Sequence, residues 1–129
     1  MTDARGVDFD TGDQAERGEE AMGSKPTDVV TVFALLRLKP GAVVEAYEQW
    51  VRESDVPVAA ATPSIGRYEV HRISGSLDGS DPAYQYVEVI EITDRAQFAE
   101  DMNSEQSRRA AREIQKYVSG SYIVGERIG

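Results

Sequence analysis

One stretch of the chain constrains its fold more than any other, the run of apolar and β-branched residues from Val29 to Leu38. It stops at Lys39-Pro40-Gly41 and is longer than a typical strand of about five or six residues. Alternate side chains of a strand point to opposite faces of a sheet, and in this run both sets are largely apolar. We therefore predict a central strand that has to be covered on both faces.

The rest of the chain offers helices for only one of these faces. Apolar residues from Val43 to Val51 recur three and four positions apart, which predicts an amphipathic helix. A second helical region follows Thr93-Asp94 and, after an interruption at Asn103-Ser104, resumes at Glu105. Because two helical regions make a single layer, the second cover is expected to be another sheet, most simply that of a second copy of the chain.

Three further strands are predicted, over Ile65–Ser74, Ala83–Ile92 and Ser121–Ile128. The first two are separated by a loop dense in turn residues, 75–82, and should form an antiparallel hairpin. The resulting order is βαββαβ, which is typical of an α+β, ferredoxin-like fold with a four-stranded antiparallel sheet. With the second copy added, the predicted assembly is a dimeric α/β barrel.

The end of the first helix carries a carboxylate with two possible roles. Asp55-Val56-Pro57 has the pattern of a helix cap followed by proline in the first turn, so the helix is predicted to bend or break near Ser54. A short second piece would then run to Thr62-Pro63-Ser64. We favour Asp55 as a cap, and the alternative is a carboxylate that lines a pocket.

Charge and composition exclude several functions. A net charge of −9 argues against binding to a nucleic-acid backbone, which depends on clustered Lys and Arg. Without cysteine and with a single histidine, a structural zinc site is not expected, and no metal site is predicted. No apolar run approaches the length that spans a bilayer, so we expect a cytoplasmic protein without membrane contact. Residues 1–27 are acidic and poor in apolar side chains, which predicts a disordered tail before one domain at 28–129.

Four segments of this domain together resemble the RedY/HapK-like family. They are Val30–Gly41, Ala46–Pro57, Glu69-Val70-His71-Arg72 and Tyr86–Asp94. The family is similar to a branch of the dimeric α/β-barrel superfamily, whose members pair two ferredoxin-like sheets face to face. The resemblance implies a homodimer from a bacterial secondary-metabolite pathway, such as pigment biosynthesis, that processes small aromatic intermediates. Because fold analogy does not fix a reaction, no catalytic motif is transferred from the family.

His71 and Glu88 are the candidate catalytic residues. Histidine is the side chain whose ordinary pKa lies near neutrality, and His71 is the only one in the chain. If the hairpin closes symmetrically between Ser76 and Ala83, His71 lies directly opposite Glu88, close enough for a hydrogen bond. In this hypothesis Glu88 orients the ring and His71 exchanges a proton with substrate. The alternative is a structural pair at the rim of the sheet, and a slip of one residue would remove Glu88 from that face.

Aromatic residues are frequent near the expected cleft between helices and sheet. Rings with an apolar body and a polar edge can line a site for a flat aromatic ligand, although many such rings are core or dimer contacts. We select Tyr47, Trp50 and Tyr86 as pocket walls. The full set of aromatic candidates also includes Tyr68, Tyr84 and Tyr117.

The preferred functional prediction is a homodimeric enzyme that needs no tightly bound cofactor and acts on a small aromatic or heteroaromatic compound by acid-base chemistry. It would be a cyclase, a hydrolase or an isomerase. Superfamily analogy offers a second enzyme, a monooxygenase that is cofactor-free or uses haem, with His71 available as a haem ligand. A third possibility is a non-catalytic module that binds a small molecule or stabilises a pathway partner.

Overall fold

The computed structural model describes residues 29–129, which form one α+β domain. Its elements are β2 (Val30–Leu38), α2 (Val44–Trp50), η2 (Val51–Asp55), α3 (Val56–Ala60), β3 (Ile65–Arg72), β4 (Tyr86–Ile92), α4 (Arg95–Asp101), α5 (Glu105–Ile114) and β5 (Val118–Gly125). The acidic tail predicted at 1–27 lies outside the described residues. Among those described, no helix is long and apolar enough to cross a membrane.

The four strands make one antiparallel sheet in the order β3-β4-β2-β5, which is the ferredoxin-like arrangement. The predicted central strand is confirmed, because β2 pairs with β4 on one side and β5 on the other. Along β2, buried residues alternate with more exposed ones, as a strand with one covered face requires.

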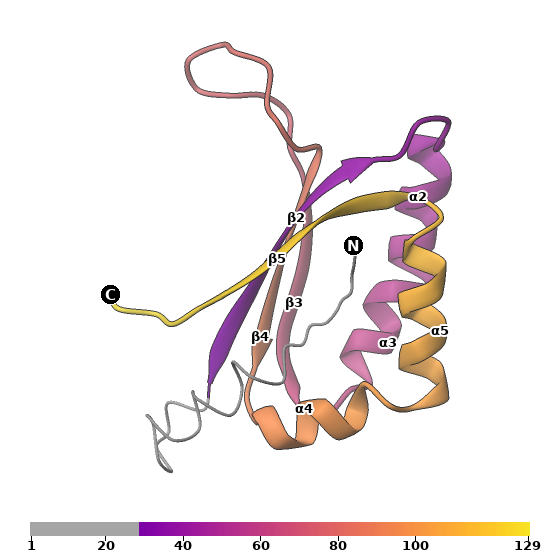
Figure 1. The fold of residues 1–129 in the computed structure, drawn as a ribbon, viewed down its shortest axis with the longest axis vertical. Coiled ribbons are helices and arrows are strands. Elements are labelled where there is room, and N and C mark those ends of the chain that lie inside the picture. The colour runs from indigo at the N-terminus through magenta and orange to yellow at the C-terminus, as the bar shows by residue number, and fades with distance from the viewer. Residues whose placement is uncertain (1–28) are drawn as a thin grey trace.

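The helices of the described residues all lie on one side of the sheet (Figure 1). The main core forms between them and the covered face and is lined by aliphatic and aromatic side chains of β2, α2, η2, β4 and β5. Its buried members are Ala34, Leu36, Tyr47, Trp50, Val51, Tyr86 and Val118. A smaller cluster of Val30, Val32 and Ile92 completes the core at the other end of the sheet.

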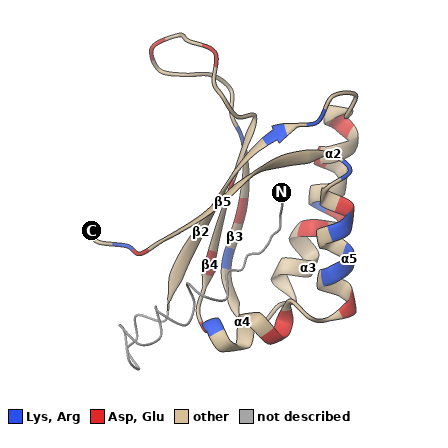
Figure 2. Ribbon diagram, viewed as in Figure 1, with Lys and Arg blue, Asp and Glu red and all other residues tan. Residues whose placement is uncertain are grey.

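The opposite face of the sheet has no cover within the described chain (Figure 1). Phe33 lies opposite Ile123 of β5 and Val89 of β4, and Leu35 lies opposite Val87 of β4. Phe33 is 36% exposed and Ile123 is 51% exposed. Figure 2 shows that β5 and most of β2 carry no charge, whereas the helices carry many. This apolar open face is what the two-faced central strand predicts.

Several predicted boundaries need correction. β3 ends at Arg72 rather than Ser74, and β4 starts at Tyr86 rather than Ala83, so the connecting loop is longer than expected. Helix α5 already ends at Ile114, and Gly120 lies inside β5 instead of ending the helix. A β carbon on Gly120 would lie 1.9 Å from the carbonyl oxygen of Leu35, which explains a glycine at this point in the ladder.

The predicted start of the second helical region is confirmed. The Asp94 carboxylate accepts a hydrogen bond from the backbone N–H of Gln97 at 3.0 Å, as an N-cap does. After the predicted interruption, Ser104 caps α5 in the same way through the N–H of Ser107. Local capping signals therefore position both helices.

Candidate functional site

The helix after β2 widens where a carboxylate turns inward. Its backbone N–H at Val56 donates to the carbonyl of Val51, five residues earlier, so Val51–Asp55 form a π-helical segment. Such segments are uncommon and are often found at functional sites. Here the segment ends on Asp55, which is only 9% exposed.

Asp55 is not a helix cap, so the favoured prediction for this residue is wrong. Its backbone is itself helical, and its side chain makes no capping hydrogen bond. The carboxylate instead accepts a short hydrogen bond from the Tyr68 hydroxyl of β3. The alternative prediction was a carboxylate that lines a pocket, but Asp55 is buried and is not among the residues that line the groove described below.

A second carboxyl group, Glu88, lies on the covered face of the sheet. It stands opposite Ala34 of β2 and Val70 of β3 and is 2% exposed. Its neighbours on the same face of β4, Tyr86 and Ile90, belong to the hydrophobic layer. A carboxyl group in such surroundings is costly to ionise.

Burial shifts the protonation of this cluster. It raises the pKa of Glu88, and the nearby charge of Asp55 raises it further, against an opposing hydrogen bond from Tyr68. Burial also raises the pKa of Asp55, again opposed by the hydrogen bond from Tyr68. The pKa of Tyr68 lies well above its ordinary value for the same reason, burial, with the two carboxylates contributing. Asp55, Tyr68 and Glu88, which we call the buried carboxyl cluster, can therefore hold a proton near neutral pH.

Two buried polar atoms, one in this cluster and one beside it, have no hydrogen-bond partner among the described residues. They are Oε2 of Glu88 and the hydroxyl oxygen of Tyr47. A buried polar group without a hydrogen-bond partner costs about 1 to 3 kcal/mol, so the presence of two such groups requires a physical explanation. Burial and then the charge of Glu88 raise the pKa of Tyr47, which keeps this hydroxyl protonated.

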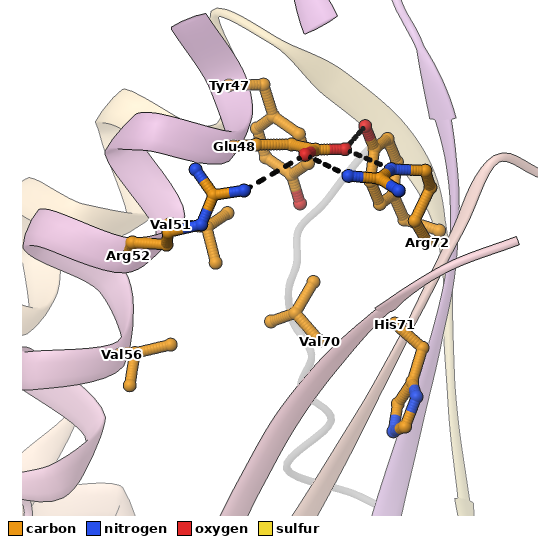
Figure 3. A pocket seen from close by; sticks show the side chains of 9 residues that line it. Tyr47, Glu48, Val51, Arg52, Val56, Val70, His71 and Arg72 are labelled. Carbon is orange, nitrogen blue, oxygen red and sulfur yellow. Dashed lines mark hydrogen bonds and ion pairs between the residues drawn. The ribbon is translucent and has the colours of Figure 1, made fainter. Parts of the chain in front are cut away.

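A groove of about 440 Å³ opens beside the cluster, between α2, η2 and α3 on one side and β3 and β4 on the other. Its lining residues are Tyr47, Glu48, Val51, Arg52, Val56, Val70, His71, Arg72 and Tyr86. Tyr47 points its hydroxyl into the space between Val51 and Val70 (Figure 3). Since Val70 is also the partner of Glu88 across the strands, the groove and the buried carboxyl cluster adjoin.

One end of the groove is closed by an ion-pair network around Glu48. Arg72 donates to this carboxylate from Nε at 2.7 Å and from Nη2 at 2.6 Å, and the Tyr86 hydroxyl donates at 2.7 Å. Arg52 adds a longer contact of 3.3 Å. The hydrogen bonds from Arg72 and Tyr86 lower the pKa of Glu48 to about 2. Glu48 is therefore ionised and fixed in place.

The predicted pairing of His71 with Glu88 is wrong. In the observed register His71 lies opposite Val87, and Glu88 lies opposite Val70, one residue away from the predicted pairing. The His71 ring points away from the other groove side chains (Figure 3), and its Nε2 contacts Glu69 at 3.0 Å. The two candidate catalytic residues therefore occupy opposite faces of the sheet.

The three predicted pocket walls separate into two groups. Tyr47 and Tyr86 line the groove, with their ring centroids 4.8 Å apart. Trp50 is not among the lining residues, because its ring packs in the core near Tyr117 and its Nε1 donates to Glu113 of α5 at 2.8 Å. Trp50 thus joins two helices.

Sequence reasoning named Tyr68 only as an aromatic candidate and missed its hydrogen bond to Asp55, which it favoured as a helix cap. Alternation along β3 and β4 would have placed Tyr68 and Glu88 on the covered face, had the register been known. A glutamate on the core-facing side of an apolar strand was the available signal. Within residues 29–129, no three His, Asp or Glu side chains gather closely enough to hold a metal ion.

Comparison with known proteins establishes the family. The model of the REDY-like protein HapK family matches residues 30–128. The chain belongs to this family. The crystal structure of HapK from Hahella chejuensis is 33% identical in sequence and has a TM-score of 0.66, with 78% of this chain and 93% of that chain covered. A search of the curated proteins found no match.

More distant structures share the fold alone. SnoaB, a cofactor-independent oxygenase from Streptomyces nogalater, is 15% identical with a TM-score of 0.64 over 79% of this chain and 95% of that chain. A dimeric ferredoxin-like protein of unknown function from Thermobifida fusca is 18% identical with a TM-score of 0.59 over 78% and 91% of the two chains. The chain thus shares the ferredoxin-like fold of these structures.

Proposed function

We propose that this HapK-family protein is an enzyme of secondary metabolism that relocates protons on a small aromatic or heteroaromatic compound without a tightly bound cofactor. The observation that carries the proposal is the buried carboxyl cluster, in which two carboxyl groups share Tyr68 beneath a groove. General acid-base catalysis requires a group that holds a proton near the working pH, and burial gives Glu88 that property. Cyclisation, hydrolysis and tautomerisation all use such a group.

The roles within the cluster follow from its surroundings. Glu88 is the more deeply buried carboxyl group and acts as the proton donor. Asp55 accepts the hydrogen bond of Tyr68 and is the group that stays ionised more readily. Tyr47 joins the cluster to the groove, where Tyr86 forms part of the wall. His71 takes no part in this mechanism because its ring lies on the other face of the sheet.

Two copies of the chain are proposed to pair through the open face of the sheet. Phe33, Leu35 and Ile123 form an apolar strip there, with Val87 and Val89 beside it. Pairing would bury this strip and complete the barrel, and exposed apolar strips of this kind mark association surfaces. The described dimer from Thermobifida fusca supports this arrangement by fold.

The test is turnover on a panel of pyrrole- and indole-containing compounds, followed by chromatography and by an oxygen electrode. With a compound that is converted, Glu88→Gln should lower kcat by about 100-fold or more, because a positioned proton donor contributes at least that much. Glu100→Gln, which makes the same change at an exposed position of α4 outside the groove, is the matched control and should keep kcat within about threefold. Full turnover by Glu88→Gln would refute the proposal, and oxygen uptake that matches turnover would favour a monooxygenase instead.

A further inference from the structure

We propose that the groove selects an anionic ligand, a small aromatic carboxylate whose charged group lies against Arg52 and Arg72. This inference rests on the proposed function and adds the charge of the substrate to it. It starts from the groups that line the groove: two guanidinium groups, from Arg52 and Arg72, and one carboxylate, Glu48. The charged end of the groove is therefore net positive in a chain whose net charge is −9.

Glu48 does not use up the donors at this end of the groove. Arg72 donates two hydrogen bonds to the Glu48 carboxylate, of 2.7 Å from Nε and 2.6 Å from Nη2. Arg52 reaches the same carboxylate through Nη2 alone, at 3.3 Å, and its side chain is 68% exposed. Because a guanidinium has five N–H donors, most of those on Arg52 are left for a ligand. Figure 3 shows both arginines reaching toward Glu48 from opposite walls.

The deeper part of the groove is suited to an apolar body with one polar atom. Val51, Val56 and Val70 provide the walls, and a volume of about 440 Å³ is within the range of small-molecule sites. Tyr47 is fully buried, and its hydroxyl, which points into this space, lacks a partner among the described residues. A polar ring atom of a ligand can supply the missing hydrogen bond.

Charge then fixes the orientation of the ligand. The charge of Asp55, which acts on the Tyr47 hydroxyl, disfavours a negative group at the inner end, whereas the arginines favour one at the outer end. A carboxylate held at Arg52 consequently directs the ring toward the buried carboxyl cluster. The imidazole ring of His71, which also lies near the groove, turns away from it.

The experiment is isothermal titration calorimetry with indole-3-carboxylate and with its neutral counterpart, indole-3-carboxamide, on the full chain. We expect the carboxylate to bind about fivefold more tightly at low salt, the size of one well-formed but solvent-exposed charge contact, and the preference to shrink at high salt. Arg52→Gln should bring the two dissociation constants together without weakening the carboxamide. Arg108→Gln, which removes an exposed positive charge from α5 outside the groove, should leave the preference intact.

Each outcome bears on a different statement. Equal binding of the two compounds to the unaltered chain, or a preference that survives Arg52→Gln, would overturn the anionic selectivity and leave the proposed acid-base site standing. Failure of both compounds to bind would count against the groove as the ligand site and so against the proposed function as well.

Discussion

Replacement of Glu88 by glutamine should stabilise the protein at neutral and alkaline pH. Burial raises the pKa of Glu88 from 4.5 to about 8, so the unfolded chain loses this proton at a lower pH than the folded chain does. When folding raises the pKa of a carboxyl group, the protein has its full stability at pH values below the ordinary pKa. That stability is lost as the pH rises from the ordinary pKa through the pKa of the folded state. Glutamine keeps the shape of the protonated acid and cannot ionise.

The size of the effect follows from the difference between the pKa of Glu88 in the unfolded chain and its pKa in the folded chain. At pH 7 the unfolded carboxyl group is almost fully ionised, while the folded one is still mostly protonated. Each tenfold difference in proton affinity corresponds to about 1.4 kcal/mol, so Glu88 lowers the free energy of unfolding at pH 7 by about 3 kcal/mol compared with a group that does not ionise. Glu88→Gln should recover most of it.

The assay is urea unfolding at fixed protein concentration, followed by the fluorescence of Trp50, the only tryptophan in the chain. The unaltered protein should lose stability between about pH 5 and pH 8, and Glu88→Gln should flatten this decline. At pH 4.5, where both states hold the proton more nearly equally, the two proteins should differ much less. Parallel pH profiles for the two proteins would refute the assignment of a raised pKa to Glu88.

Three further substitutions test separate parts of the structure. Tyr68→Phe should lower the free energy of unfolding in urea by about 1 to 3 kcal/mol, because it leaves the Asp55 carboxylate without its hydrogen-bond donor. An unchanged unfolding midpoint would contradict a stabilising hydrogen bond from Tyr68 to Asp55. Gly120→Ala should destabilise by about 2 kcal/mol or more, since the new β carbon would meet the backbone of β2, whereas Gly75→Ala in the open loop should be nearly neutral. Ile123→Glu should convert a dimer into a single-chain species by light scattering, and a dimer that persists would place the interface elsewhere.

The layered fold could be predicted from the sequence because its signals are local. A long apolar run followed by Pro40-Gly41 identified β2, and the capping signal at Thr93-Asp94 identified the start of α4. Apolar spacing of three and four positions identified α2. Each of these signals lies within a dozen residues, so it does not depend on how distant segments meet.

The register of the hairpin could not be predicted, because its loop is too long to fix it. Pairing continues to Ile73, whose N–H donates to Gln85, and the turn is centred on Gly79 rather than between two residues. A loop of this length absorbs one residue without penalty, whereas a two-residue turn would not. That single residue moved Glu88 to the covered face and left His71 on the open one.

The candidate site depended on distant contacts for the same reason. Asp55 precedes a proline-containing turn, which locally favours a cap, and the partner that overrides this preference is Tyr68 on a strand of the sheet. The π-helical segment that turns Asp55 inward has no signature in the sequence that distinguishes it from an α-helix. The sequence therefore identified Asp55, Tyr68 and Glu88 as individual candidates, but only the structure showed that they lie together.

The most direct test of the acid-base site is a carbon-13 NMR titration of the glutamate side-chain carboxyl groups, with Glu88→Gln used to assign the resonance of Glu88. We predict that this resonance keeps the chemical shift of a protonated acid at pH 7 and moves only at higher pH. A Glu88 carboxyl group that completes its titration below about pH 6, as ordinary glutamates do, would contradict the buried proton donor on which the proposed chemistry depends.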